Sequence, residues 1–147
     1  MSAPWSRLRE KFRTDRRCDE SSCRDRSDTS ADAEVEPPDR AEIGRAAWRY
    51  LHAMAAEHPE KASELDESAA QAWIAAFIQN YPCAHCATHF VDVCEALPPD
   101  TSSRRAYSVW WCEAHNKVNE HLMQEKRSCI PEKLIEAGRK GLTLDDE

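Results

Sequence analysis

The chain has few glycines, no long hydrophobic run and no excess of positive charge. Only 3 of its 147 residues are glycine, and none forms part of a Gly-x-Gly-x-x-Gly motif. This excludes the phosphate-binding turn of a dinucleotide-binding α/β fold. No run of about 20 apolar residues occurs, so the sequence predicts no membrane span. The net charge of −7 argues against nucleic acid as the main partner, because phosphate binding needs a basic surface.

Cysteine, in contrast, is abundant. Seven cysteines in so short a chain are unusual for a reducing cytosol unless they bind metal, and an odd number leaves at least one thiol without an intramolecular partner. Two of them, Cys18 and Cys23, lie in a stretch rich in Asp, Glu, Ser, Arg and Ala that cannot bury enough apolar surface to offset the entropy of ordering. We therefore expect residues 1–40 to be a flexible segment, and residues 141–147 to be an acidic tail.

From residue 41 onward the apolar residues repeat with a helical period. The period predicts five helices, at about residues 41–54, 69–81, 82–97, 102–122 and 131–137. Asp39 is a candidate N-cap for the first, and Pro82 suits the first turn of the third. Helices joined by short loops over residues 41–140 predict an all-α domain, a four-helix bundle with a short fifth helix.

The segment Tyr81-Pro82-Cys83-Ala84-His85-Cys86 is the strongest local signal for chemistry. Two thiols three positions apart at the start of a helix can close into a reactive disulfide. Backbone N–H groups and the helix dipole would stabilise a thiolate at Cys83, and its pKa should fall below the ~8.5 of free cysteine. Such a pair is a redox centre, a pair of metal ligands, or chemically inert.

Zinc is the first alternative. Cys83 and Cys86, together with Cys112 and His115 further along the chain, offer three thiolates and an imidazole for a tetrahedral site. Zinc knuckles usually place the Cys-x-x-Cys pair on a tight turn, whereas Pro82 favours the start of a helix. A further alternative is an interaction domain whose cysteines are only structural.

Two other motifs favour the redox interpretation. His115-Asn116-x-Val118-Asn119 lies on the fourth expected helix, where Cys112 precedes Cys129 by 17 residues, and Gly44-Arg45-x-x-Trp48-x-x-Leu51-His52 lies on the first. With the Cys83-x-x-Cys86 segment, their order and spacing resemble the Erv/ALR family of FAD-linked sulfhydryl oxidases over roughly residues 41–135. Because Trp48 and His52, like His115 and Asn119, are four residues apart, each pair shares a helix face, and the four could form a polar and aromatic wall.

The resemblance implies FAD bound noncovalently inside the bundle and a set of site residues. Cys83 would be the outer thiol, which substrate attacks, and Cys86 would face the flavin and pass electrons to it. Cys112 and Cys129 would form a structural disulfide, and Cys94 would be a buried free cysteine. The implied cofactor-binding residues are Gly44, Arg45, Trp48, His52, Tyr81, Cys86, His89, Cys112, His115, Asn116, Val118, Asn119 and, for the pyrophosphate, Lys126.

The resemblance also implies an activity and partners. The chain would oxidise protein thiols to disulfides, with electrons passing from a Cys18/Cys23 shuttle pair to Cys83/Cys86, then to FAD, and finally to oxygen, giving hydrogen peroxide, or to cytochrome c. We expect a homodimer. The absence of an apolar secretory signal and the shuttle pair favour the mitochondrial intermembrane space and an import oxidoreductase as partner. Another oxidising compartment, or a viral or cytosolic origin, stays open.

Overall fold

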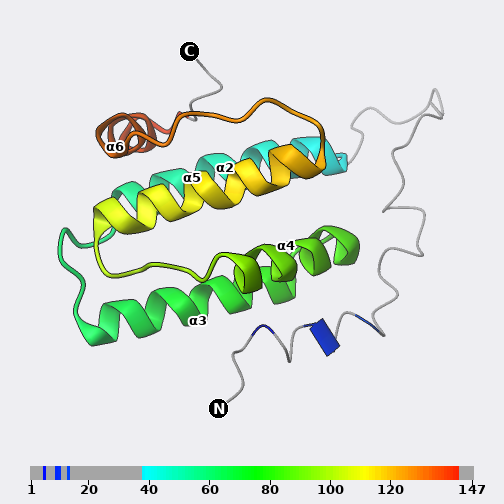
Figure 1. Ribbon diagram of the computed structural model, residues 1–147, viewed down its shortest axis with the longest axis horizontal. Helices are drawn as coiled ribbons and strands as arrows, with labels where there is room; N and C mark the ends of the chain where they lie inside the picture. The colour runs from blue at the N-terminus through cyan, green and yellow to red at the C-terminus, as the bar shows by residue number, and fades with distance from the viewer. Residues whose placement is uncertain (1–4, 6–8, 11–12, 14–37, 143–147) are drawn as a thin grey trace.

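The structure is a computed structural model, which describes residues 5, 9, 10, 13 and 38–142. Its helices are α2 (Arg40–Ala56), α3 (Glu64–Asn80), α4 (Ala84–Ala96), α5 (Arg104–His121) and α6 (Pro131–Arg139). Among the described residues there are no strands. In Figure 1, α2 and α5 run side by side, α3 and α4 form the other half of the bundle, and α6 covers α2 and α5. The prediction of an all-α four-helix bundle with a short fifth helix is confirmed.

Two helices begin with reciprocal caps that the sequence encodes. The Asp39 carboxylate accepts the Glu42 N–H at 2.8 Å, and the Glu42 carboxylate accepts the Asp39 N–H at 3.1 Å. Ser63 and Asp66 form the same capping box at the start of α3. Each box satisfies backbone donors that the first turn of a helix leaves without partners. The prediction of Asp39 as an N-cap is confirmed.

The third helix begins later than predicted. Pro82 precedes α4 rather than opening its first turn, and the N-cap is Cys83, whose backbone is extended (φ −129°, ψ 103°). The Cys83 sulfur takes the position of a capping oxygen and accepts the Cys86 N–H at 3.2 Å. The start of the helix is therefore set by the same two cysteines that form the motif.

The core is aromatic and lies where α4 faces α5. Trp111 is fully buried, its ring stacks with that of Phe90 at a centroid distance of 5.9 Å, and Tyr107 packs against it as well. Trp110 is also buried, and its indole N–H donates to the carbonyl of Leu97 at 3.0 Å. Each such side chain contributes roughly 1.5–3 kcal/mol by burial, so this cluster fixes the position of α4 relative to α5.

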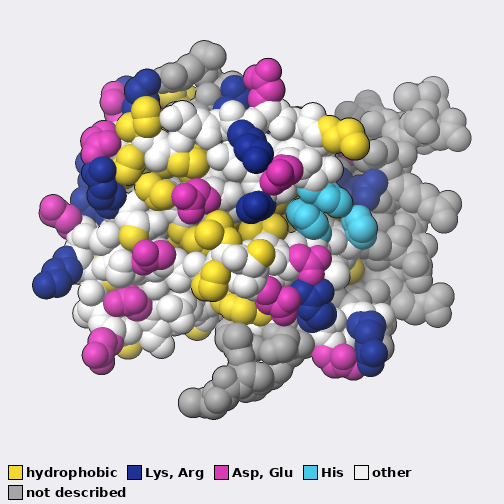
Figure 2. Space-filling model, in the orientation of Figure 1, with side chains coloured by type: hydrophobic (Ala, Val, Ile, Leu, Met, Phe, Trp, Pro, Cys, Tyr) yellow, Lys and Arg dark blue, Asp and Glu magenta, His cyan; other side chains and the backbone are white. Residues whose placement is uncertain are grey.

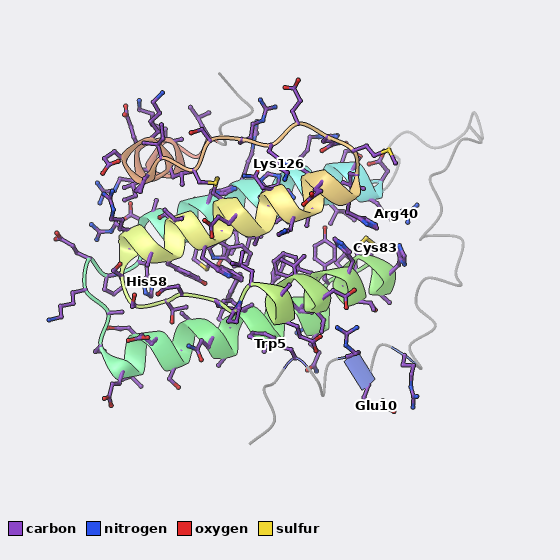
Figure 3. All side chains as sticks on the ribbon, in the orientation of Figure 1. Trp5, Glu10, Arg40, His58, Cys83 and Lys126 are labelled. Carbon is purple, nitrogen blue, oxygen red and sulfur yellow. A yellow bond between two sulfur atoms is a disulfide. The ribbon has the colours of Figure 1, made fainter. Side chains whose placement is uncertain are left out.

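Part of the N-terminal segment packs against the bundle. Trp5 is 7% exposed and belongs to the hydrophobic core, and Figure 3 shows it below the helices. Arg9 pairs with Asp92 and Glu95 on α4. The segment is thus anchored at these residues by one apolar and one ionic contact. The expected shuttle pair, Cys18 and Cys23, and residues 143–147 of the expected tail lie outside the described residues.

Within the described ranges no helix is both long and apolar enough to cross a bilayer. Figure 2 shows lysine, arginine and acidic side chains interspersed over the face in view, with apolar side chains between them.

Candidate active site

The two cysteines of the motif form a disulfide at the start of α4. The Cys83 and Cys86 Cα atoms are 5.3 Å apart, within the usual range for a disulfide. Cys83 precedes the helix and Cys86 lies in its first turn, and the Cys86 N–H donates to the Cys83 sulfur. When this bond is reduced, that donor and the helix dipole stabilise a thiolate at Cys83 more than one in open solution.

The exposure of the two cysteines differs from the expected order. Cys83, expected as the outer thiol, is only 2% exposed, whereas Cys86 is half-buried. The physical reason is the capping geometry, which turns the Cys83 sulfur inward over the end of the helix. Figure 3 places Cys83 and Arg40 at the same end of the bundle, away from His58. In this conformation Cys86 is the more accessible half of the disulfide.

Rings from α2 and α5 contact one another inside the bundle and form a wall. Trp48 and His115 stack face to face, with ring centroids 3.8 Å apart and planes 9° from parallel. His52, one turn beyond Trp48, places its Nε2 3.2 Å from Nδ1 of His115. Trp48 also contacts Phe90 of α4 edge-on, with a centroid distance of 6.2 Å, which links the wall to the helix that carries the disulfide. Three of the four residues predicted to form the wall, Trp48, His52 and His115, therefore contact one another.

The wall is electrically neutral at His52. Burial, and to a lesser degree the charge of His115, lower the pKa of His52 to about 4. The imidazole is therefore uncharged at neutral pH and presents one N–H donor and one nitrogen acceptor. A flat, partly apolar wall in which His52 is uncharged suits an aromatic ligand.

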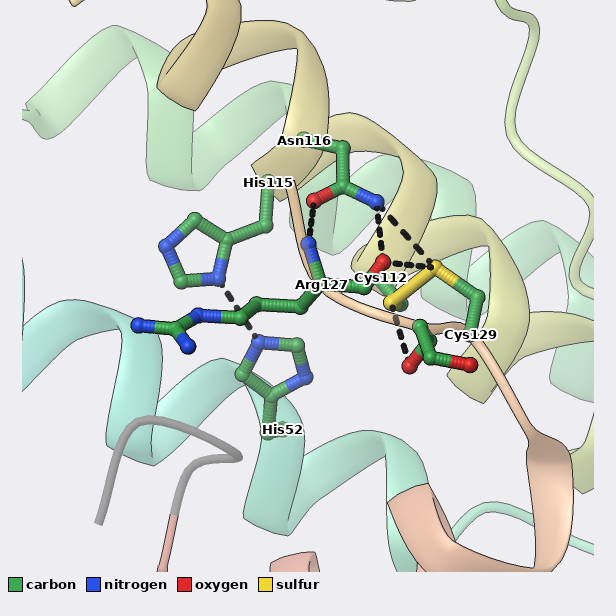
Figure 4. Close-up of a disulfide and its surroundings, with 7 residues drawn as sticks. His52, Cys112, His115, Asn116, Arg127 and Cys129 are labelled. Atoms are coloured by element: carbon green, nitrogen blue, oxygen red, sulfur yellow. Dashed lines mark hydrogen bonds between the residues drawn. A yellow bond between two sulfur atoms is a disulfide. The ribbon is translucent and has the colours of Figure 1, made fainter. Parts of the chain in front are cut away.

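The loop between α5 and α6 is attached to α5 by a disulfide and by Asn116. Cys112 and Cys129 are bonded, with Cα atoms 5.7 Å apart, which confirms the predicted pairing. The Asn116 amide N–H₂ donates to the Arg127 carbonyl at 2.9 Å, and the Arg127 N–H donates to the Asn116 oxygen at 2.8 Å (Figure 4). Asn116 thus holds the loop against α5, and the cofactor role that the resemblance implies for it stays a prediction.

Three more of the predicted residues are buried or half-buried in the bundle. Val118 is half-buried against the core, and Asn119 is buried one turn beyond His115. Tyr81 is half-buried, and burial raises the pKa of its hydroxyl. A Cβ at Gly44 would lie 3.9 Å from the Tyr81 hydroxyl, so α2 and the end of α3 meet directly before Cys83.

Two histidines form a second ring contact nearby. His89, one turn past Cys86 on α4, stacks on His121 at the end of α5 with centroids 4.0 Å apart. Burial and the neighbouring His121 lower the pKa of His89. Figure 2 shows histidine side chains gathered in one patch of the surface. Because its ring partner is His121 at the end of α5, His89 does not form part of the Trp48–His115 wall.

Lys126 lies in the loop after α5 and is exposed. Its Nζ is 3.4 Å from the Glu120 carboxylate, and it lines a shallow groove of about 340 Å³ along α5. The groove is lined by Leu97, Glu113, Asn116, Lys117, Glu120 and Lys126. None of these residues comes from the start of α4, so the groove is separate from the disulfide. Arg45, the other predicted cation, is exposed on α2 one turn before Trp48.

The zinc alternative is wrong for this structure. Its four expected ligands are Cys83, Cys86, Cys112 and His115, but the three thiols belong to two separate disulfides and the imidazole stacks on Trp48. Among the residues that the structure describes, no group of three or more His, Cys, Asp or Glu side chains could hold a metal ion. Cys94 is a buried free cysteine, as expected, and burial raises its pKa to about 12.

Comparison with known proteins identifies related sequences and folds. Residues 45–137 match the Erv1/Alr family. The chain is 38% identical over 90 residues to "FAD-linked sulfhydryl oxidase ERV2" of Saccharomyces cerevisiae, covering 61% of this chain and 46% of that protein. It is 36% identical over 95 residues to "Mitochondrial FAD-linked sulfhydryl oxidase ERV1" of the same yeast, covering 65% and 50%. The chain thus spans about half the length of these relatives.

Solved structures share the fold. The crystal structure of the FAD-binding domain of Erv1 from Saccharomyces cerevisiae superimposes with a TM-score of 0.66 at 30% sequence identity, covering 73% of this chain and all of that one. The crystal structure of the yeast Erv1 core superimposes with the same TM-score, 0.66, at 30% identity, covering 80% of this chain and 98% of the other.

Proposed function

The chain belongs to the Erv1/Alr family, and we propose that it is an FAD-linked sulfhydryl oxidase that forms disulfide bonds in protein substrates. One observation carries the proposal: a Cys-x-x-Cys disulfide opens α4, and Phe90 of the same helix contacts a wall of rings from α2 and α5. The names of its relatives agree with this activity.

The residues present fit FAD. Trp48 and His115 supply flat faces, and His52 supplies a neutral donor and acceptor, which are the groups that hold a planar heteroaromatic ring system. With no glycine-rich phosphate loop in the chain, side chains must hold the cofactor. Gly44, Arg45, Tyr81, His89, Val118 and Asn119 complete the proposed site. When bound, FAD would supply an acceptor for two electrons from the reduced cysteine pair, and it would be reoxidised by oxygen, giving hydrogen peroxide, or by cytochrome c.

The chain's own part is thiol–disulfide exchange. A substrate thiolate attacks the Cys83 sulfur, the Cys83–Cys86 bond breaks, and Cys86 leaves as a thiolate. The second substrate thiolate then attacks the mixed disulfide at the substrate sulfur and releases the Cys83 thiolate, so two electrons move to the pair and the substrate becomes a disulfide. Because Cys83 is 2% exposed, its side chain must turn outward before the substrate thiolate can attack the sulfur. The half-exposed Cys86 is the sulfur that faces the cofactor.

Three further proposals concern the shuttle pair, the oligomeric state and the location. We propose Cys18 and Cys23 as the shuttle pair that receives substrate electrons; both lie outside the described residues. A homodimer through the first two helices is supported by the exposed apolar residues Tyr50 on α2 and Leu65 on α3. The mitochondrial intermembrane space, with an import oxidoreductase as partner, is supported by relatives named as mitochondrial in two yeasts.

An absorbance spectrum of the purified protein tests the proposal. We expect visible flavin bands that bleach with dithiothreitol without air and return when air is admitted. Cys86→Ser should keep the bands but lose oxygen consumption with dithiothreitol, and Cys94→Ser is the matched control that should keep both. A protein that stays colourless after incubation with FAD would overturn the proposed function.

A further inference from the structure

Arg9 attaches the N-terminal segment to α4. Its guanidinium pairs with the carboxylates of Asp92 and Glu95, and its Nε lies 3.4 Å from the Glu95 carboxylate. The two carboxylates are three residues apart on α4, so they share a helix face and one arginine can bind both. Four residues before Arg9, Trp5 is 7% exposed and belongs to the hydrophobic core. One ionic and one apolar contact therefore hold the same short stretch of chain on the bundle.

The same helix carries the core disulfide, Cys83–Cys86, at its start. Asp92 lies six residues after Cys86, and Glu95 lies nine residues after it. Because a helix rises 1.5 Å per residue, the two carboxylates are about 9 and 14 Å along α4 from Cys86. Arg9 is thus held within about three helical turns of the core disulfide.

The chain returns to the bundle at the start of α2. This helix begins at Arg40, and Figure 3 places Arg40 at the same end of the bundle as Cys83. The proposed shuttle pair lies between the two attachments: Cys18 is nine residues after Arg9, and Cys23 is 17 residues before Arg40. The structure describes neither of these cysteines, but it describes where the chain is held on both sides of them.

Lengths of chain of this size are sufficient to reach the core disulfide. A random coil of nine residues has an r.m.s. end-to-end distance of about 15–18 Å, comparable with the separation along α4. The effective concentration of a tethered group falls as roughly the −3/2 power of the tether length beyond the best match. A coil held nine residues away on one side and 17 on the other is confined like a single tether of about six residues. Loss of the nearer attachment should therefore lower the effective concentration of the shuttle pair about fivefold.

We propose that Trp5 and Arg9 are positioning residues that keep the shuttle pair within reach of the core disulfide of the same chain. The inference rests on the proposed function, because it concerns the shuttle pair of that reaction. A shuttle thiolate attacks the Cys83 sulfur, and Cys86 leaves as a thiolate. The second shuttle thiolate then attacks the shuttle sulfur of the mixed disulfide and releases the Cys83 thiolate, so two electrons move to the core pair and the shuttle pair becomes a disulfide.

The test traps this exchange and needs no bound flavin. Cys86→Ser leaves a Cys83 thiol that can attack the oxidised shuttle pair, which forms a mixed disulfide with one shuttle sulfur and releases the other as a thiolate. Reduced Cys86→Ser protein is treated with one equivalent of diamide, which takes up the two electrons of disulfide formation. Mass spectrometry of the linked peptides then follows how fast Cys83 becomes bonded to the shuttle pair.

Variants on either side of the contact measure the anchor. In the Cys86→Ser protein, Arg9→Gln should slow trapping about two- to fivefold, and Trp5→Ala about fivefold. Replacing the partners on α4 instead, by Asp92→Asn with Glu95→Gln, should slow trapping as much as Arg9→Gln does. Arg13→Gln is the matched control, because Arg13 pairs with Glu10 of its own segment, and its trapping rate should stay within about twofold. Unchanged trapping in both Arg9→Gln and Trp5→Ala would overturn the proposal.

A mixture of two chains shows whether the exchange occurs within one chain. The first is the Cys86→Ser protein with both shuttle cysteines also replaced by serine, and the second keeps the shuttle pair but has Cys83→Ser and Cys86→Ser. Linkage between them should be far slower than trapping within one chain, and equal rates would overturn the proposal, because the shuttle pair would then serve a second copy. A protein that traps as expected but binds no FAD would overturn the proposed function, a result distinct from both.

Discussion

The same change, glycine to alanine, should have opposite effects on stability at two positions. Gly138 lies in α6 against α2, where a Cβ would be 2.5 Å from the carbonyl oxygen of His52 and 2.8 Å from the Ala56 Cβ. Gly44 lies in α2, where the nearest atom to a Cβ is the Tyr81 hydroxyl at 3.9 Å. The first position has no space for a methyl group and the second has enough.

The magnitudes follow from two opposing effects. Alanine is favoured over glycine inside a helix by about 1 kcal/mol. At Gly138 the methyl group meets a backbone carbonyl, which cannot rotate away, and with two contacts below 3.0 Å the cost lies in the upper part of the usual range for overpacking, about 2–3 kcal/mol. Gly138→Ala should therefore lower the free energy of unfolding by about 1–2 kcal/mol, which corresponds to about 4–16 °C in Tm for a domain of this size. Gly44→Ala should raise it by about 0.5–1 kcal/mol.

Urea unfolding of both variants and the unmodified protein, with equal cofactor content, measures the difference. The slope of free energy against urea should not change, so that the midpoint reports stability alone. A Gly138→Ala protein as stable as the original would refute the reasoning, because it would mean that α6 does not approach α2 at His52. A Gly44→Ala protein less stable than the original would also refute it, because it would mean that another group lies closer to Gly44 than the Tyr81 hydroxyl does.

Three further predictions concern charge, backbone and the disulfide. Burial lowers the pKa of His52 to about 4 from 6.5, so its contribution to stability is complete above pH 6.5 and is lost as the pH falls through about 4, by up to about 1.4 kcal/mol per pH unit. The free energy of unfolding, measured at several pH values, should therefore depend less on pH in His52→Gln. An equal dependence in both proteins would contradict the lowered pKa. Met123 is 95% exposed with φ of 57°, so Met123→Gly should stabilise the protein by about 0.5–1 kcal/mol in the same urea assay, whereas Met123→Ala should not. Replacing Cys112 and Cys129 together by serine should cost about 3 kcal/mol, and a loss below about 1 kcal/mol would mean that the loop is held without the bond.

Local signals in the sequence predicted most of the fold. Asp39 followed by Glu42 marks the start of α2, and Pro131 marks the start of α6, because caps and helix breakers act within one turn. Three helix ends differ from the prediction: α3 begins at Glu64 and not near residue 69, Gly138 lies inside α6 and does not end it, and α4 begins after Pro82. Proline before the Cys-x-x-Cys pair suggested a helix from residue 82, but the Cys83 sulfur itself caps the helix, which propensity rules do not anticipate.

Within the candidate site, spacing predicted which residues meet but not what each of them does. Four-residue spacing brought Trp48 and His52 together with His115, and it could do so because helix faces are fixed by the 3.6-residue period. The direction of a side chain on a loop has no such period. The hydrogen bond from the Arg127 N–H to Asn116, between residues 11 positions apart, holds this loop and could not be read from spacing, and the cofactor role of Lys126 stays a prediction.

The packing of α6 and the ring wall should be coupled through one residue. The carbonyl of His52 faces Gly138, and the ring of the same residue contacts His115, which stacks on Trp48. Alanine at Gly138 pushes on the His52 backbone and should therefore weaken FAD binding as well as stability.

The control for this coupling is an equal loss of stability made elsewhere in the bundle. Ile74→Val removes one methylene from a fully buried side chain of α3 and should cost about 0.5–1.5 kcal/mol. Titration of flavin-free protein should then show weaker FAD binding in Gly138→Ala and unchanged binding in Ile74→Val, since α3 carries none of the wall rings. Equal affinities in both variants would mean that the wall keeps its geometry whatever α6 does, and that α6 contributes to stability alone.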